Sequence, residues 1–210
     1  MSFLKSFFRQ EFEAKGLDMT NEPFIQALEI ALHTNKSLFL TGRAGTGKTT
    51  FLHTLRKFNP TKNMVVVAPT GVAAINAKGK TIHSFFKIDP RQIFLPDDPR
   101  LQASGSKQNI FDTFKYTNSR LTVIRQLDLL VIDEISMVRV EILDIIDQIL
   151  RVFRRKPHLP FGGVQLILIG DPFQLPPIVK DKDWSILATK YETRFFFSSY
   201  GFKELMPFHI

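Results

Sequence analysis

The chain has 210 residues, of which 44% are apolar and 23% are charged, a composition typical of soluble globular proteins rather than of collagens, coiled coils or disordered chains. It contains no cysteine, which excludes disulfide bonds, a thiol nucleophile and a cysteine-ligated zinc site. Its 28 Lys and Arg exceed its 20 Asp and Glu, and the resulting net charge of +8 suggests a polyanionic partner.

Nothing in the chain predicts membrane association. No apolar run reaches the ~18 residues that a membrane-spanning helix needs. Lys5 and Arg9 interrupt the apolar N-terminus, so it does not resemble a secretory signal. We therefore expect an intracellular protein that does not bind membranes.

The spacing of apolar residues predicts alternating helices and strands. Helical spacing occurs over residues 3–15, 20–34, 48–58, 71–78 and 139–154. Short, nearly continuous apolar runs predict strands at residues 37–40, 64–68, 127–132 and 164–169. Strands that alternate with helices indicate an α/β fold, with a parallel sheet flanked by helices on both faces.

Two segments depart from this alternation. Residues 88–120 are rich in proline and polar residues, and we interpret them as an irregular insertion on the surface. In the C-terminal tail, the sequence predicts one short helix around Trp184 and a strand at residues 195–197.

A phosphate-binding motif lies between the first predicted strand and the helix that follows it. Gly42, Gly47, Lys48 and Thr49 fit the pattern G-x-x-x-x-G-K-[ST] in the required context. Glycines allow backbone N–H groups to point at phosphate oxygens, the lysine adds a cation, and the threonine offers a hydroxyl to Mg²⁺. The alternatives are a glycine-rich turn without a ligand and a dinucleotide fold, and the latter fails because its third glycine position is Thr50.

Polar residues follow the last two predicted strands. Asp133 and Glu134 fit a magnesium-binding acid and a carboxylate that orients or deprotonates water. Gln174 follows the next strand, where an amide can reach a terminal phosphate. Ligands of parallel sheets bind beyond the carboxyl ends of the strands, where these groups converge with the phosphate motif. The alternatives are a helix cap for the acids and a proline-rich turn for Gln174.

Small and polar residues follow the second predicted strand. Thr70 and Gly71 begin a helix, and Thr81, His83 and Ser84 come soon after. Free N–H groups at a helix start suit a phosphodiester, while His83 and the pair Phe85 and Phe86 could stack on bases. The alternative is a helix cap followed by core aromatics.

Together these segments resemble the first motor domain of the PIF-type DNA helicases, in superfamily 1B. The resemblance extends from Gln26 to Ile210, and its blocks occur in the family's order: GRAGTGKTT, VAPTGVAAINAKGKTIHSFF, LLVIDEISMV and PFGGVQLILIGDPFQLPPI. It implies a RecA-like P-loop NTPase fold with ATP and Mg²⁺ as cofactors and single-stranded DNA as partner.

The resemblance also implies roles for individual residues. Lys48, Glu134 and Gln174 are expected to be catalytic, and Thr49 and Asp133 to hold the metal. The expected DNA-binding residues are Thr70, Gly71, Thr81, His83 and Ser84. The expected nucleotide-binding residues are Gln26, which would read adenine, and Gly42, Ala44, Gly45, Thr46, Gly47, Lys48, Thr49 and Thr50.

The resemblance further implies a domain organisation. We expect an N-terminal helix within residues 1–20 and a RecA-like domain over residues 21–210, with residues 88–120 in the place of the family's 1B wedge. The second RecA-like domain, with its arginine fingers, is not expected within this chain and would be its partner. Because such arginines contribute about 10³ to 10⁵ in rate, we expect a monomer that binds ATP but hydrolyses it slowly.

The leading functional hypothesis is the motor domain of a 5′ to 3′ DNA helicase. The alternative is a nucleotide-gated clamp on single-stranded DNA without unwinding activity. A P-loop kinase of small molecules is disfavoured by Glu134, because a phosphotransferase has no use for a water-activating carboxylate.

Overall fold

The computed structural model describes residues 10, 12–14, 16, 18–43, 45–59, 61–103 and 109–210. Most of the predicted N-terminal helix lies outside these residues, as does Ala44. Within them, the chain forms one six-stranded sheet, in the order β3-β2-β4-β5-β1-β6, and every neighbouring pair is parallel. The predicted α/β fold with a parallel sheet is confirmed.

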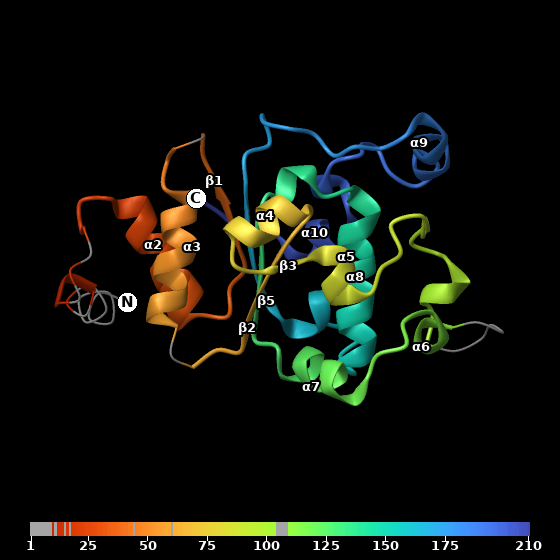
Figure 1. Cartoon of the computed structure of the whole chain (residues 1–210), viewed down its shortest axis with the longest axis horizontal. Helices are drawn as coiled ribbons and strands as arrows, with labels where there is room; N and C mark the ends of the chain where they lie inside the picture. Colours follow the sequence, from red (N-terminus) through yellow and green to blue (C-terminus); the bar gives the residue numbers. More distant parts are fainter. Residues whose placement is uncertain are drawn as a thin grey trace.

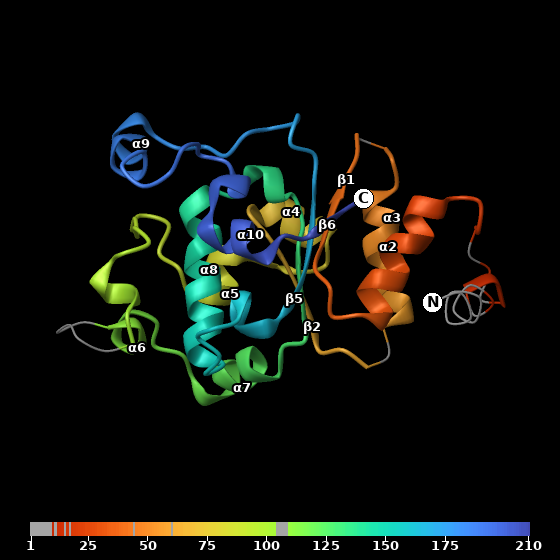
Figure 2. The same ribbon diagram turned by 180° about the vertical axis from the view of Figure 1, so that it is seen from behind.

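The four central strands are those that the apolar runs predict. They are β1 (Leu38–Thr41), β2 (Met64–Ala68), β4 (Leu129–Ile132) and β5 (Gln165–Gly170). The edge strands β3 (Lys80–Thr81) and β6 (Phe208–His209) have two residues each and lack a sequence signal. In Figure 1 the sheet is seen edge-on from the β3 side, and Figure 2 shows β6 on the opposite side.

Helices cover both faces of the sheet. On one face lie α2 (Glu22–His33) and α3 (Lys48–Phe58), whose apolar side chains pack on Leu38, Leu40, Leu129 and Val131. On the other face lie α5 (Ile82–Phe86), α7 (Asn118–Gln126) and α8 (Val140–Phe153), which pack on the alternate strand residues. Successive strand residues face opposite sides, so both faces of the central strands are buried.

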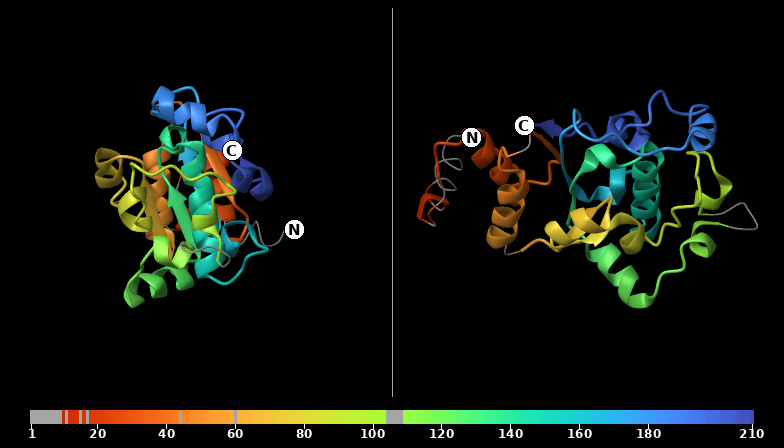
Figure 3. Two further views of the ribbon diagram at one scale, coloured as in Figure 1. Left: turned by 90° about the vertical axis from the view of Figure 1, so that its right-hand side faces the viewer. Right: turned by 45° about the horizontal axis from the view of Figure 1, so that its top comes forward.

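Shorter elements follow in the described part of the chain. They include the helices α4 (Gly71–Asn76), α6 (Ile110–Thr113), α9 (Asp181–Leu187) and α10 (Tyr200–Leu205). The 3₁₀ turns are η1 (Pro99–Leu101), η2 (Ile135–Met137), η3 (Pro160–Gly163) and η4 (Phe196–Ser198). The molecule is elongated, with α2 and α3 at one end and α6 and α9 at the other (Figure 3).

The structure corrects two expectations. The predicted strand at residues 195–197 is wrong, because Phe195 and Phe196 accept turn hydrogen bonds from Ser198 and Ser199 and η4 forms instead. The segment 88–120 is irregular, as expected, but its described part does not lie only on the surface. Ile88, Phe94, Leu101, Ile110 and Phe114 are each at most 3% exposed and belong to the same core as α8, whereas Phe111 is 49% exposed.

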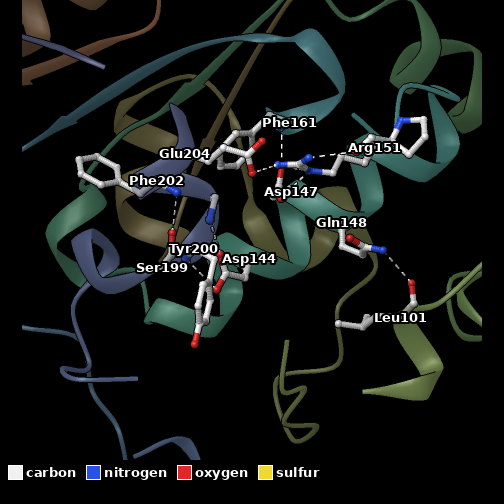
Figure 4. Close-up of polar contacts among 12 residues, drawn as sticks. Leu101, Asp144, Asp147, Gln148, Arg151, Phe161, Ser199, Tyr200, Phe202 and Glu204 are labelled. Carbon is white, nitrogen blue, oxygen red and sulfur yellow. Dashed lines mark hydrogen bonds and ion pairs between the residues drawn. The ribbon is translucent and has the colours of Figure 1, made fainter. Parts of the chain in front are cut away.

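Acidic residues on α8 attach the C-terminal part of the chain. Asp144 accepts hydrogen bonds from Gly201 N (2.9 Å) and Tyr191 Oη (2.8 Å). Asp147 accepts from Phe161 N and from Arg151 Nε (2.8 Å), and Arg151 reaches Glu204 on α10 (Figure 4). Burial raises the pKa of both aspartates despite these bonds. This network holds η3 and α10 against α8.

The network makes a prediction about stability. Asp147→Ala leaves the Phe161 N–H without its acceptor and removes a buried partner of Arg151. We expect the free energy of unfolding to fall by about 3 kcal/mol, as measured by urea denaturation. Asp112→Ala, an exposed control on α6, is expected to change it by less than about 0.5 kcal/mol. Equal stabilities of the two variants would contradict the role of Asp147.

Candidate nucleotide and DNA site

The phosphate-binding loop connects β1 to α3. Gly45 and Gly47 adopt positive φ angles of 79° and 95°, which glycine tolerates without strain. Gly47 caps α3 without a side-chain hydrogen bond, so the first N–H groups of the helix are open to an anion. A Cβ atom on Gly42 would lie 2.6 Å from Thr46 Oγ1, so a larger residue there would require the Thr46 side chain to move.

Lys48 lies over this loop. Its Nζ donates hydrogen bonds to the carbonyl oxygens of Gly42 and of Arg43, the latter at 2.9 Å. The ammonium group is therefore held at the helix start, where the N–H groups also point. This arrangement suits the negative charge of a phosphate.

Asp133 and Glu134 extend from the end of β4. Burial raises the pKa of Asp133, the neighbouring Glu134 raises it further, and Lys48 opposes the change. Glu134 has φ 52° and ψ 45°, a left-handed conformation that costs a non-glycine residue about 1 kcal/mol or more. A Cβ atom on Gly170 would lie 3.1 Å from Ile135 N, so β5 packs closely against this turn.

Two of the three predicted catalytic residues, Glu134 and Gln174, line one hollow of ≈ 390 Å³ at the carboxyl ends of the strands, whereas Lys48 lines the second hollow described below. Thr49, Asp133 and Thr70 also line the first hollow. A magnesium ion bound to nucleotide needs only one or two protein oxygens, because phosphates and water supply the rest. Thr49 and Asp133 fit this requirement. The described residues contain no cluster of three or more His or acidic residues that could hold a metal by itself.

A second hollow of ≈ 320 Å³ lies on the other side of the loop. Thr46, Gly47 and Lys48 line it together with Asn21 and Phe24 at the start of α2. Phe24 packs edge-to-face on Phe51, with ring centroids 5.8 Å apart. Gln26 is exposed and does not line this hollow, so the structure does not bring it to the predicted site.

The remaining predicted nucleotide-binding residues differ in whether they line a hollow. Gly45 and Thr50 are exposed and line neither hollow, whereas Gly42 and Thr46 line the second. Ala44 belongs to the same loop but lies outside the described residues.

Of the predicted DNA-binding residues, only Thr70 lines the first hollow, while Gly71, Thr81, His83 and Ser84 do not. Thr70 Oγ1 caps α4 by accepting from Ala73 N, and Thr81 Oγ1 caps α5 by accepting from Ser84 N, both at 3.2 Å. Thr70 and His83 line a third hollow, of ≈ 170 Å³, together with Arg139 and Ile178. Thr70 and Met137 line both the first and the third hollow, so they lie between the two.

His83 is half-buried, whereas the neighbouring phenylalanines are fully enclosed. Burial and the nearby Arg139 lower the pKa of His83, so its ring is neutral at pH 7 and suited to stacking or hydrogen bonding. Phe85 and Phe86 are 3% and 0% exposed, and their rings pack against each other at 4.8 Å. The prediction that they stack on bases is wrong, because the core covers them.

Comparison with known proteins decides the family. The family model described as PIF1-like helicase matches residues 21–193. The chain belongs to the PIF1-like helicase family. No helix in the described part of the chain is long and apolar enough to cross a membrane.

Two curated relatives illustrate this membership in the PIF1-like family. The ATP-dependent DNA helicase PIF1 of Saccharomyces cerevisiae (strain YJM789) is 38% identical over 172 residues, which are 80% of this chain and 18% of the relative. The ATP-dependent DNA helicase PIF1 of Homo sapiens is 35% identical over 178 residues, which are 84% of this chain and 24% of the relative. The chain thus spans about a fifth of their length.

Solved structures of PIF1-like helicases share the fold. A crystal structure of Pif1 helicase from Bacteroides, in complex with ADP-AlF3 and single-stranded DNA, matches with a TM-score of 0.76 and 39% identity. The match covers 90% of this chain and 40% of that one. The RecA-like architecture inferred from the sequence is therefore confirmed.

Sequence reasoning missed several residues that surround the site of this PIF1-like domain. Asn21 and Phe24 line the second hollow, and Arg139 lines the third. Asn21 could have been placed at the start of a helix, because asparagine is a preferred cap and its Oδ1 accepts from Phe24 N at 3.2 Å. The positions of Phe24 and Arg139 depend on tertiary packing and had no local signal.

Proposed function

We propose that this chain is the first motor domain of an ATP-dependent 5′ to 3′ DNA helicase, which binds Mg-ATP and single-stranded DNA. The observation that carries the proposal is the convergence of Thr49, Asp133, Glu134, Gln174 and Thr70 on one hollow beside the phosphate-binding loop. These residues supply a hydroxyl and an acid for the metal, a second acid for water and an amide for phosphate, and Thr70 also belongs to the candidate DNA-binding residues.

Each residue has a distinct task in this proposal. Lys48 and the N–H groups at the start of α3 bind the phosphates, and Thr49 and Asp133 hold the metal. A magnesium ion held by Thr49 and Asp133 would supply positive charge to stabilise the phosphates. Glu134 orients and deprotonates the attacking water, and Gln174 contacts the terminal phosphate.

The base of the nucleotide fits the second hollow, which we assign to Asn21 and Phe24 instead of Gln26. Phe24 offers an aromatic surface and Asn21 a polar edge. The exposure of Gln26 on α2, outside this hollow, supports the assignment.

The DNA strand lies along the starts of α4 and α5, which we call the strand track: Thr70, Gly71, Thr81, His83 and Ser84. Gly71 is exposed, and a Cβ atom there would meet nothing within 4 Å. A phosphodiester can therefore approach its backbone closely. The two threonine hydroxyls accept cap bonds and still have a proton to donate.

The proposal extends to partners and to the full protein. A second RecA-like domain would supply arginines and a second grip on the strand, so the chain alone is expected to be a monomer with slow ATP hydrolysis. The homologues named as DNA helicases support an intracellular location. The wedge role of residues 88–120 remains a proposal, since the burial of the segment constrains its attachment but not its action.

A nucleotide-gated clamp on DNA is the second candidate. It is favoured by the position of Thr70, which lines both the catalytic hollow and the one on the DNA side. ATPase measurements on the full-length protein with and without single-stranded DNA distinguish the two, because only a motor couples steady-state turnover to DNA.

The strand track is tested by Gly71→Leu. The added side chain meets no protein atom near the Cβ position but occupies the space of the DNA backbone. We expect affinity for a short single-stranded oligonucleotide to fall about tenfold or more, with unchanged thermal stability and nucleotide affinity. Ala103→Leu, which adds a similar side chain to an exposed position outside the track, is the control. Equal DNA affinities of the two variants would contradict the assignment of the strand track as a DNA-binding surface.

A further inference from the structure

One stretch of the sequence is free of carboxylates. No Asp or Glu occurs between Glu29 and Asp89, whereas this stretch contains nine basic residues: Lys36, Arg43, Lys48, Arg56, Lys57, Lys62, Lys78, Lys80 and Lys87. A second carboxylate-free stretch, between Asp112 and Asp128, adds Lys115, Arg120 and Arg125. The positive charge of the chain is thus concentrated in two segments that are separate in the sequence.

The structure brings these two segments together at the β3 edge of the sheet. Arg56 on α3 donates from Nη2 to the carbonyl oxygen of Lys78 at 3.0 Å. Lys80 on β3 and Arg120 on α7 line one hollow of ≈ 220 Å³. We call these four residues the cationic edge. The elements that carry them lie toward the viewer in Figure 1.

Arg120 is fixed in this edge. Its Nη1 donates to the carbonyl oxygen of Phe85 at 2.9 Å, and its guanidinium carbon lies 5.2 Å from the centre of the Phe85 ring. A guanidinium has five N–H donors, so most of those of Arg120 remain open to a ligand. Ser119 borders the same hollow and adds a hydroxyl.

Carboxylates do not neutralise the cationic edge. In the described ranges, the ion pairs involve other basic residues, such as Arg91, Arg100, Arg139 and Arg151. Lys78 also has a φ of 48°, a left-handed position where glycine is unstrained and lysine is not. An unpaired row of cations over a surface is the pattern that binds a polyanion without reading bases.

The cationic edge adjoins the strand track, because Lys80 directly precedes Thr81. We propose that the cationic edge binds the phosphodiester backbone of the DNA that flanks the strand held in the track. This inference rests on the proposed function, and it adds a contact surface separate from the nucleotide hollows. The flanking DNA can be further single strand or duplex, since both present the same phosphates.

The test neutralises the two lysines of the cationic edge. Neither Lys78 nor Lys80 lends its side chain to a hydrogen bond or ion pair that the structure describes, so Lys78→Gln with Lys80→Gln should leave the thermal melting temperature unchanged. Lys182→Gln with Lys203→Gln is the matched control, because it removes the same charge from α9 and α10, and α10 lies near the opposite edge of the sheet, beside β6 (Figure 2). The exposed ion pair of Lys203 with Glu192, at 3.6 Å, contributes little to stability.

Three DNA ligands separate the sources of phosphate: an oligonucleotide that only fills the track, the same oligonucleotide with a longer single strand, and the same oligonucleotide joined to a duplex. We expect the variant to bind the first like the control. For at least one of the other two, its affinity should fall about tenfold at low salt, and the slope of log affinity against log salt should decrease by about 2.

The outcomes are distinct. A loss confined to the longer single strand identifies single-stranded flanking DNA, and a loss confined to the duplex ligand identifies a duplex arm. Slopes equal to those of the control with all three ligands overturn the proposal, as does an equal loss with the shortest ligand. Failure of the track itself appears separately, as normal binding of the shortest ligand by Gly71→Leu.

Discussion

Lys48→Ala is expected to weaken binding of Mg-ATP by about a hundredfold or more. The ammonium group is held over the phosphate-binding loop by the carbonyl groups of Gly42 and Arg43, at the start of α3. Its loss removes charge-assisted hydrogen bonds to phosphate, which contribute about 1.5–3 kcal/mol each. Titration with a fluorescent ATP analogue measures the effect.

The control for Lys48→Ala is on the same helix. Lys57→Ala removes the same charge from α3, but Lys57 is exposed near the opposite end. It should bind nucleotide like the unmodified protein, and both variants should melt cooperatively at similar temperatures. Equal nucleotide affinities of the two variants would remove the phosphate-binding assignment of the loop.

Glu134→Gln is expected to reduce ATP hydrolysis by about 10² to 10⁴ while leaving nucleotide affinity within a few-fold. The amide keeps the shape of the side chain but cannot accept a proton from water. Single-turnover hydrolysis with protein in excess over ATP measures this step even when steady-state turnover is slow. An unchanged hydrolysis rate would show that Glu134 is only a turn residue.

The left-handed backbone of Glu134 requires a second measurement. Glutamine at this position keeps a side chain in the strained conformation, so Glu134→Gln should not change the free energy of unfolding by more than about 0.5 kcal/mol. Glu192→Gln, an exposed control, should hydrolyse ATP at the normal rate. Together these variants separate a loss of chemistry from a loss of structure.

The sequence was most informative where local chemistry decides the structure. The phosphate-binding loop depends on glycines and a lysine at fixed spacing, and the central strands depend on apolar runs buried on both faces. These features need no distant partner to be recognised. The convergence of Asp133, Glu134 and Gln174 followed from a general property of parallel sheets.

The sequence was least informative where tertiary packing decides. Phe195, Phe196 and Phe197 have the composition of a strand, but the burial of Phe196 against Phe39 favours a turn. Phe85 and Phe86 have the composition of a stacking platform and lie instead in the core. Gln26 is two residues from Phe24 on α2, and residues two apart do not share a face of a helix. Phe24 lines the second hollow and Gln26 therefore does not.

The position of Thr70 has a mechanical consequence. This residue lines the first hollow and the hollow beside His83, so the start of α4 contacts both the candidate nucleotide site and the candidate DNA site. Coupling between nucleotide binding and DNA binding therefore does not require a conformational change in the protein core, because a displacement of Thr70 changes the shape of both hollows. Substitutions deep in the core should therefore change the free energy of unfolding without changing how strongly nucleotide binding affects DNA binding.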